Sequence, residues 1–295
     1  MKRTAIPVVY RPEMSVQVAA FAPSASKPAK VVEDWLAHQL PISIIAAEPV
    51  NAAILKRTHN ARYVDDVLSL RTANGWGTRE AHVCDALLHN SGAIALATQI
   101  AMEEGLAVCP VSGFHHAGYD FGGGFCTFNG LMVAIDQARL IRPDERITAG
   151  ILDLDYHYGN GTADIVLQHL ADGIEIMHFT SGDEYYRAHQ ADDLLKRLPE
   201  VVCDMARQCD VILYQAGADM HVDDPLGGML TSAQMRERDR IVFDTFALHK
   251  REGTGLVWNL AGGYQQEADG SIPKVLALHR ATMEECVKVF VGSEA

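Results

Sequence analysis

Four short apolar runs in this chain each end in, or lead directly into, polar side chains. Helical patterns separate these runs, and apolar strands that alternate with helices are typical of a parallel sheet covered by helices on both faces. The carboxyl ends of such strands meet at one edge of the sheet, where α/β proteins place their functional sites. The four runs are Leu106–Val111, Ile147–Leu152, Asp210–Asp219 and Gly255–Leu260.

The strand ends carry a set of residues suited to binding a metal ion. Asp155 and His157 follow the second run two residues apart, so their side chains point the same way because strand side chains alternate with period two. Asp219, at the end of the third run, adds a second carboxylate. Catalytic zinc sites keep three protein ligands and leave one position open, although a set without thiolate also permits Fe(II), Mn(II) or Co(II). The pattern predicts one metal site.

A histidine pair and a tyrosine complete the chemistry of this edge. His115 and His116 lie in a loop before the triple glycine Gly122–Gly124, which is no phosphate-binding loop because no Gly-Lys-Ser/Thr follows it. Two imidazoles beside a metal-activated water can act as general base and general acid. Tyr264, after the fourth run, is a neutral donor for a developing oxyanion. Together these residues predict metal-assisted amide hydrolysis.

Five sequence blocks resemble the histone deacetylase family, which has the arginase–deacetylase fold. They are GFHH, GGGFCTFN, DLDYHYGNGT, QAGAD with a following DDPLGG, and AGGYQ, and they keep the family's order and spacing from about residue 40 onward. GFHH, in place of the commoner Pro-Gly-His-His, looks most like the class IV branch and related bacterial amidohydrolases. The resemblance implies a single-domain, three-layer α/β/α fold around a central, mainly parallel sheet.

The resemblance also implies roles for the residues of the matching blocks. One zinc ion per chain would be bound by Asp155, His157 and Asp219. His116 would be the main general base and acid with His115 as an electrostatic helper, while Tyr264 would polarise the scissile carbonyl.

Two further matches concern the partners of the histidines. Asp153 matches the carboxylate that partners the first histidine and helps to hold a structural monovalent cation, K⁺. Asn160 matches the partner of the second histidine, and because an amide steadies an imidazolium less than a carboxylate does, we expect His116 to have the lower pKa of the two. The residues that match the walls of the acyl channel are Gly124, Phe125 and, opposite them, Tyr185 or Tyr186.

The expected activity is zinc-dependent removal of an acetyl or longer fatty acyl group from lysine side chains or a related amine. The alternatives are deacetylation of small molecules such as acetylpolyamines and, in a different class of protein, a catalytically weak acyl-lysine reader. A reader would have lost a ligand or the tyrosine, and this chain has lost neither. A two-manganese ureohydrolase of the same fold needs an Asp two residues beyond the ligand histidine, where this chain has Gly159.

Composition limits the partners. The chain has 295 residues, 48% of them apolar, and no Pro/Ser-rich linker, which predicts one catalytic domain over residues 1–295. A net charge of −13 argues against direct nucleic-acid binding and is compatible with an acylated lysine peptide or small acylated amine. Six scattered cysteines without a CxxC pair, and no apolar run of membrane-spanning length, predict a cytoplasmic protein that binds no membrane. A homo-oligomer is compatible with the sequence.

Outside the motifs, periodicity predicts further elements. An edge strand is expected first, a loop at the site entrance next, and then four long helices, of which the first is interrupted around Asn90–Gly92 and the third has Ser232 as its N-cap. These elements are Ile6–Tyr10, Pro23–Pro28, Arg79–Gly105, Asp192–Cys209, Ser232–Glu252 and Pro273–Phe290.

Overall fold

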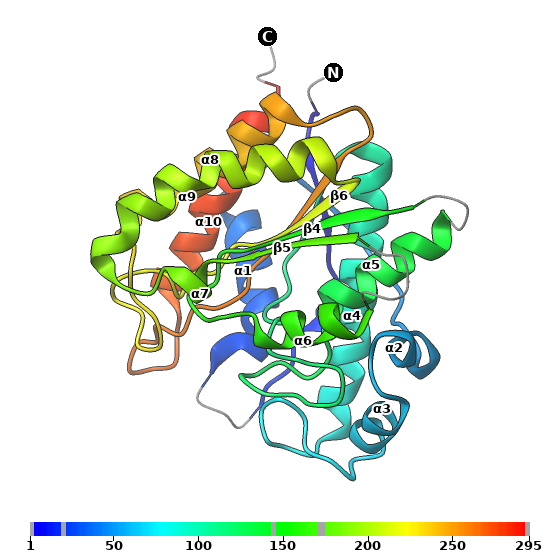
Figure 1. Cartoon of the computed structure of the whole chain (residues 1–295). Helices are drawn as coiled ribbons and strands as arrows, with labels where there is room; N and C mark the ends of the chain where they lie inside the picture. The colour runs from blue at the N-terminus through cyan, green and yellow to red at the C-terminus, as the bar shows by residue number, and fades with distance from the viewer. Residues whose placement is uncertain (1–2, 19–21, 143–145, 170–174, 293–295) are drawn as a thin grey trace.

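A seven-stranded parallel sheet runs through the middle of the protein (Figure 1). The structure is a computed structural model, and it describes residues 3–18, 22–142, 146–169 and 175–292. The strand order is β2-β1-β3-β7-β6-β4-β5, and each pair of neighbours is parallel. The strands are β1 (Ile6–Val9), β2 (Ile42–Ile45), β3 (Leu106–Cys109), β4 (Thr148–Asp153), β5 (Glu175–Thr180), β6 (Val211–Gln215) and β7 (Gly255–Asn259).

The four predicted apolar runs are the inner strands β3, β4, β6 and β7. Every residue of β3, β6 and β7 is buried, which explains why these runs are apolar throughout and do not alternate. In the register of the sheet, Asp153 at the end of β4 lies opposite Gln215 of β6 and Thr180 of β5. The polar segments after these strands therefore start at the same level of the sheet.

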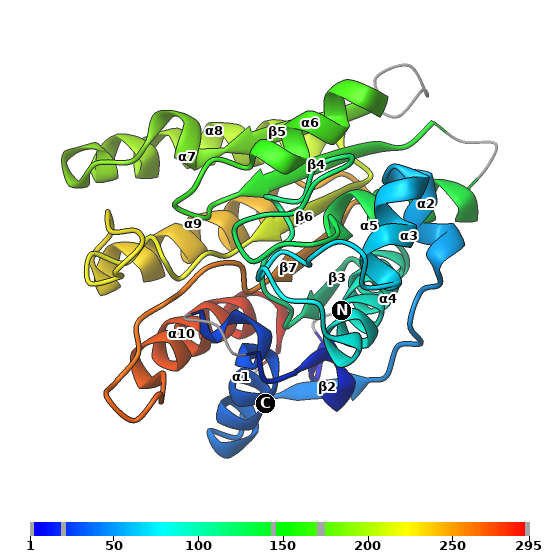
Figure 2. The same cartoon turned by 90° about the horizontal axis from the view of Figure 1, so that it is seen from below.

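Helices cover both faces, so the predicted three-layer α/β/α fold is confirmed. In Figure 2 the strands from β5 to β3 descend through the picture, with α9 and α10 on one side and α4 and α5 on the other. One face is covered by α1 (Lys27–Ala37), α8 (Ala191–Gln208), α9 (Ser232–His249) and α10 (Pro273–Phe290). The other is covered by α4 (Ala81–Glu104), α5 (Gly130–Ile141) and α6 (Asn160–His169).

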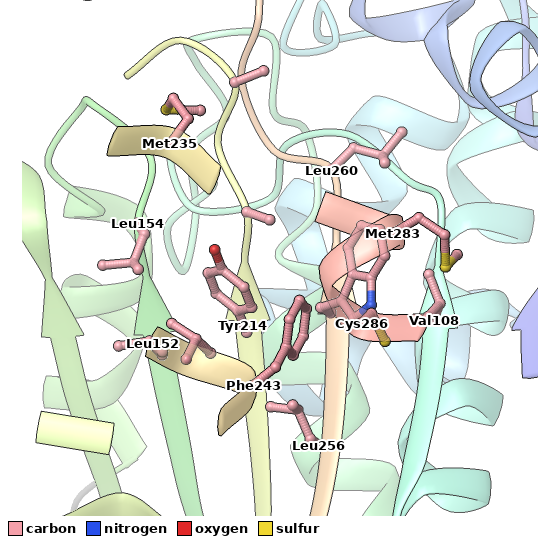
Figure 3. Packing of buried hydrophobic residues seen from close by; sticks show 14 of the residues in the cluster. Val108, Leu152, Leu154, Tyr214, Met235, Phe243, Leu256, Leu260, Met283 and Cys286 are labelled. Atoms are coloured by element: carbon pink, nitrogen blue, oxygen red, sulfur yellow. The ribbon is translucent and has the colours of Figure 1, made fainter. Parts of the chain in front are cut away.

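Aromatic side chains join the helices of the first face to the sheet. The rings of Trp35 on α1 and Trp258 on β7 meet edge to face at 5.6 Å between centroids, and those of Tyr214 on β6 and Phe243 on α9 at 6.0 Å. Figure 3 shows Tyr214 and Phe243 packed beside Cys286 of α10. Each such buried side chain contributes about 1.5–3 kcal/mol by leaving water. The remaining helices are α2 (Ala52–Thr58), α3 (Ala61–Leu68) and the short α7 (Ser181–Glu184).

The first strand is not at the edge of the sheet. β1 covers Ile6–Val9 of the predicted Ile6–Tyr10, but it pairs with β2 on one side and β3 on the other. The edge is β2, a four-residue strand whose side chains are partly exposed. The prediction was wrong because strand order depends on pairing between distant segments, and the burial of all of β1 agrees with an inner position.

Three local predictions are also corrected. Helix α4 is continuous through Asn90–Gly92, with Gly92 buried against the backbone of Glu48. Helix α9 is capped by Thr231 and not by Ser232, and Gln234 completes a capping box with it. The expected loop Pro23–Pro28 instead forms a 3₁₀ turn followed by the start of α1, so Lys27 and Pro28 are helical and buried. Helix α10 has the predicted bounds.

Candidate metal and catalytic site

Asp155, His157 and Asp219 come together at the carboxyl end of the sheet. Nδ1 of His157 lies 3.1 Å from Oδ1 of Asp155 and 3.0 Å from Oδ2 of Asp219. One ligand atom from each of the three residues lies within 4.8 Å of the others, as the ligands of a single ion must. Both carboxylates are buried, while about a third of the His157 side chain is exposed. The three side chains could hold one metal ion that is reached from the His157 side.

Backbone N–H groups fix the two carboxylates. Oδ2 of Asp155 accepts a hydrogen bond from the amide of Gly262 at 2.8 Å, and Oδ1 accepts one from the amide of His157 at 2.9 Å. Oδ1 of Asp219 accepts one from the amide of Tyr156 at 3.2 Å. Asp155 is thus held by the loop after β7 and by its own loop, and Asp219 is held by the loop after β4. The loops after β4, β6 and β7 therefore orient one another's side chains.

The charges within this set are strongly coupled. Burial would lower the pKa of His157, but hydrogen bonds to the two carboxylates outweigh it and raise this pKa to about 11. Burial and the neighbouring charge of Asp155 raise the pKa of Asp219. Two carboxylates brought this close need a cation between them, and a protonated imidazole or a metal ion both meet that need.

The predicted histidine pair sits beside these ligands, and each ring has a partner of its own. Nδ1 of His115 donates to Oδ2 of Asp153 at 2.7 Å, and Nδ1 of His116 donates to Oδ1 of Asn160 at 2.6 Å. The two ring centroids are 4.1 Å apart, and that of His116 is 5.8 Å from His157. Asn160 is the first residue of α6, which begins directly after the ligand loop.

The two histidines differ in protonation in the predicted direction. Burial would lower the pKa of His115, but the charges of Asp153 and Asp155 outweigh it and raise this pKa to about 9. Burial, followed by the positive charge of His115, lowers the pKa of His116 to about 4. At neutral pH His115 is therefore charged and His116 neutral. Because Nδ1 of His116 donates to Asn160, its Nε2 carries the free lone pair.

Tyr264 faces His157 across the site, with 6.5 Å between the ring centroids. Its side chain is nearly buried, and burial followed by the charges of Asp155 and Asp219 raises its pKa well above the usual value. The hydroxyl therefore stays protonated and able to donate. Phe125 lies beside it at 5.7 Å between centroids, so these two of the predicted site residues form one wall.

Gly124 and Tyr186, the other predicted channel residues, are both exposed and contact different parts of the site. Gly124 packs against the ring of His116, since a Cβ at this position would lie 2.4 Å from Cδ2 of the imidazole. Tyr186 has an exposed ring, and its backbone oxygen accepts a hydrogen bond from the hydroxyl of Tyr156 at 2.8 Å. This bond ties the segment after α7 to the ligand loop.

Two residues beneath the site were missed by the sequence analysis. Lys27 is fully buried, and its ammonium donates hydrogen bonds to the carbonyl oxygens of Ala261 and Gly262. These two residues closely precede Tyr264 in the chain. Burial lowers the pKa of Lys27 to about 8, against the pull of nearby carboxylates. Oδ2 of Asp224, from the DDPLGG block, accepts the amide of Tyr264 at 2.7 Å. No local pattern marks a lysine whose partners are main-chain oxygens from the far end of the chain.

Gly159 leaves little room for the carboxylate that a second metal site would need. A Cβ at Gly159 would lie 2.7 Å from Oδ2 of Asp153, so the extra carboxylate of a two-metal ureohydrolase has no room there. Within the described residues, Asp155, His157 and Asp219 form the one group of three or more potential ligands that could hold a metal ion. Both observations agree with a single ion.

The family follows from a comparison with known domains. A family model described as the histone deacetylase domain matches residues 22–182, more than half of the chain. The chain belongs to the histone deacetylase family. Members of this family are deacetylases and related amidohydrolases, so membership supports a hydrolase. Among the described residues no helix combines the length and the apolar character needed to cross a membrane.

Relatives and a solved structure agree with this assignment. An uncharacterized protein of Picosynechococcus is 31% identical over 222 residues, covering 69% of this chain and 71% of its own. Histone deacetylase 2 of Arabidopsis thaliana is 31% identical over a match that covers 60% of this chain and 49% of the plant protein. Acetylpolyamine amidohydrolase 1 of Pseudomonas aeruginosa is 44% identical over a match that covers 26% of this chain and 22% of the bacterial protein. The crystal structure of the HDA15 HD domain has the same fold, with a TM-score of 0.76 at 18% identity over 98% of this chain and 91% of that one.

Proposed function

We propose that this deacetylase-family chain is a zinc-dependent amidohydrolase that removes an acetyl or longer fatty acyl group from a lysine side chain or a related amine. The observation that carries the proposal is the convergence on one point of three metal-ligand side chains, a neutral histidine and a protonated tyrosine. The ring of His157 supports it, since it lies 5.8 Å from that of His116 and 6.5 Å from that of Tyr264, measured between centroids.

The residues present fit a zinc ion. Two carboxylates and one imidazole within 4.8 Å of one another match the three-ligand sets of catalytic zinc sites. Asp155, His157 and Asp219 would hold the ion, with Nδ1 of His157 as its nitrogen ligand. When bound, zinc supplies Lewis acidity, which polarises the amide carbonyl and brings the pKa of water toward neutrality.

His116 would take the proton from the attacking water. Its pKa of about 4 keeps the ring neutral, and the bond from Nδ1 to Asn160 leaves Nε2 free to accept that proton. The same nitrogen can then pass the proton to the departing amine. Because His116 stands next to a charged His115, holding the proton is unfavourable, which speeds its release to the leaving group.

His115 and Tyr264 would stabilise the negative charge that develops on the former carbonyl oxygen. Asp153 holds His115 in its charged form, close to Asp155 and about 4 Å from the His116 ring centre. The Tyr264 hydroxyl, which keeps its proton, would donate a neutral hydrogen bond to the same oxygen.

Two kinds of substrate fit the proposed reaction. A lysine peptide carrying an acyl group and a small acylated amine such as an acetylpolyamine both suit a chain with a net charge of −13. The similarity to an acetylpolyamine amidohydrolase covers 26% of this chain and supports the small-molecule alternative, while the similarity to a plant histone deacetylase covers 60% and supports the first. We also propose a single domain, a cytoplasmic location and no contact with nucleic acid or membrane.

The K⁺ ion near Asp153 stays a prediction. Both carboxylate oxygens of Asp153 already have partners within the protein, His115 for Oδ2 and the amide of Asp155 for Oδ1. Activity in potassium against sodium buffers at equal ionic strength tests the prediction, and equal rates would argue against the ion.

The experiment for the proposed function is hydrolysis of a matched peptide series. Zinc-loaded protein is given acetyl-, octanoyl- and myristoyl-lysine peptides and acetylspermidine, with and without a hydroxamate. We expect hydroxamate-sensitive cleavage of at least one of them. Asp219→Ala should lose both the metal and the activity, while Asp223→Ala, whose side chain is 59% exposed, should keep the metal.

Two outcomes would contradict the proposal. Full activity of Asp219→Ala with bound zinc would refute the ligand set. One tightly bound zinc ion with no turnover of any substrate would favour an acyl-lysine reader over an enzyme.

A further inference from the structure

Arg238 is a fully buried arginine on α9, on the side of the sheet opposite to α4 and α5. Burying a guanidinium is costly unless all of its donors have partners. Its charge partner is the next residue, since Nε donates a hydrogen bond to Oδ1 of Asp239 at 2.8 Å, while Nη2 lies 2.8 Å from the same oxygen without making a hydrogen bond. The ion pair alone does not account for the third nitrogen.

That third nitrogen, Nη1, bonds to the main chain of both ligand loops. It donates to the carbonyl oxygen of Gly217 at 2.7 Å and to that of Leu154 at 3.3 Å. Leu154 is the residue directly before Asp155, and Gly217 comes two residues before Asp219. A single nitrogen therefore joins the segment after β4 to the segment after β6, each within two residues of a carboxylate of the candidate metal site.

The carboxylate that holds Arg238 is itself fixed from two sides. Oδ1 of Asp239 accepts a hydrogen bond from the hydroxyl of Tyr214 on β6, and Oδ2 accepts one from Oγ1 of Thr282 on α10 at 2.6 Å. Figure 3 shows the Tyr214 ring among the packed side chains of β6, α9 and α10, which limit its movement. The guanidinium is thus tied to the sheet and to a neighbouring helix, and a group so fixed can define the position of what it binds.

The two ligand carboxylates need such a constraint. Asp155 and Asp219 are both buried and carry like charges that repel each other. Their loops leave the adjacent strands β4 and β6, whose main-chain ladder extends one bond past the end of β4, from the amide of Leu154 to the carbonyl oxygen of Gln215 at 3.0 Å. The spacing of the residues farther along the two loops needs a further restraint. The pair of carbonyl bonds from Arg238 supplies that restraint from behind the site.

We propose that Arg238 is a positioning residue that sets the spacing of the two carboxylate ligands by binding the carbonyl oxygens of Leu154 and Gly217. It acts through the main chain and touches neither metal nor substrate. The inference rests on the proposed metal site and adds a determinant of metal affinity outside the ligand set. Partners of metal ligands typically change affinity by 10–100-fold when they are removed.

The test compares zinc affinity with stability. Zinc affinity is measured by competition with a chromophoric chelator, and the thermal midpoint is measured with and without zinc. In the double variant R238M/D239N no unpaired charge is left behind, and we expect zinc affinity to fall about 10–100-fold. Arg238→Lys keeps a charge and a donor but cannot span both carbonyls and Asp239 together, so its affinity should lie between that of the double variant and wild type.

Arg236 provides a matched control on the same helix. It pairs with Glu284 and Glu285 of α10 at 2.6 Å and has no bond to either ligand loop. Arg236→Met should lower the thermal midpoint with zinc and without it by similar amounts and leave zinc affinity within about threefold of wild type.

The outcomes separate this inference from the proposed function. Wild-type protein that binds no zinc would refute the proposed function. Wild type that binds zinc, with R238M/D239N equal to it in affinity, would overturn the role of Arg238 alone. If the double variant does not fold, Arg238→Lys decides, and a zinc affinity equal to wild type in that variant overturns the inference.

Discussion

The close packing of Gly124 against His116 makes a sharp prediction about two adjacent glycines. In Gly124→Ala the new methyl group would lie 2.4 Å from Cδ2 of His116, where ordinary contacts begin at 3.4 Å. The imidazole must therefore retreat by about 1 Å, and a misplacement of that size costs roughly 10²-fold in rate. The backbone of Gly124 is also left-handed, with φ of +52°, which costs a residue with a side chain about 1–2 kcal/mol.

Gly123→Ala is the matched control. A Cβ at Gly123 meets no atom within 4 Å, and its φ lies outside the left-handed range. We expect activity equal to wild type and a stability that is unchanged or higher by up to about 1 kcal/mol, because alanine restricts the unfolded chain. Neither glycine is a ligand, so both variants should bind zinc as wild type does.

The assay is kcat/KM on the best substrate of the peptide series, together with zinc content and thermal midpoint. Activity of Gly124→Ala within threefold of Gly123→Ala would refute the packing argument, provided that His116→Ala is inactive. If His116→Ala is itself active, the assignment of the general base fails instead. Equal losses in both glycine variants would mean that the loop as a whole, and not contact with His116, matters.

Three further predictions follow from the site. Tyr264→Phe should keep its zinc and lose roughly 10²–10³ in kcat, the usual loss of one oxyanion donor, and an unchanged rate would remove Tyr264 from the mechanism. Lys27→Met should lower kcat by about tenfold or more with zinc content unchanged, because the carbonyls of Ala261 and Gly262 lose their donor, whereas Lys27→Arg keeps donors and should recover most of the rate. Because the pKa of His157 is about 11, the ring carries an extra proton at pH 7, and zinc binding through Nδ1 must release it, so affinity should rise with pH. Calorimetric titration in two buffers of different ionisation enthalpy measures this release, and heats that do not depend on the buffer would contradict it.

Much of the site could be predicted because its residues stand at the ends of strands. The apolar runs before Asp153 and Asp219 are buried on both faces, so their composition identifies them as inner strands without knowledge of their partners. Side-chain alternation predicted that Asp155 and His157 point to the same side. In the structure both lie in the bend after β4, where the amide of His157 donates to Oδ1 of Asp155. The uncharged Asn160 predicted that His116 has a lower pKa than His115. The direction is confirmed, but burial and then the charge of His115 lower the pKa of His116, while the bond to Asn160 raises it.

Pairing and capping were harder to predict. β2 was not recognised as a strand because the four residues Ile42–Ile45 include a serine and are partly exposed, and β1 was consequently placed at the edge. The cap of α9 was assigned one residue late, since Thr231 and Ser232 are both good N-caps and the capping box between Thr231 and Gln234 distinguishes them.

The sequence by itself determined the fold class, the family and the side chains that converge at the strand ends, because apolar runs and motif spacing are local properties. The tertiary structure alone decided how those side chains are held. Lys27 and Arg238 are charged residues that composition would assign to the surface, yet both are fully buried. Their partners are carbonyl oxygens 234 and 21 residues away along the chain, at Ala261 and Gly217. Every residue type has such an oxygen, so a bond to it leaves no mark in the sequence.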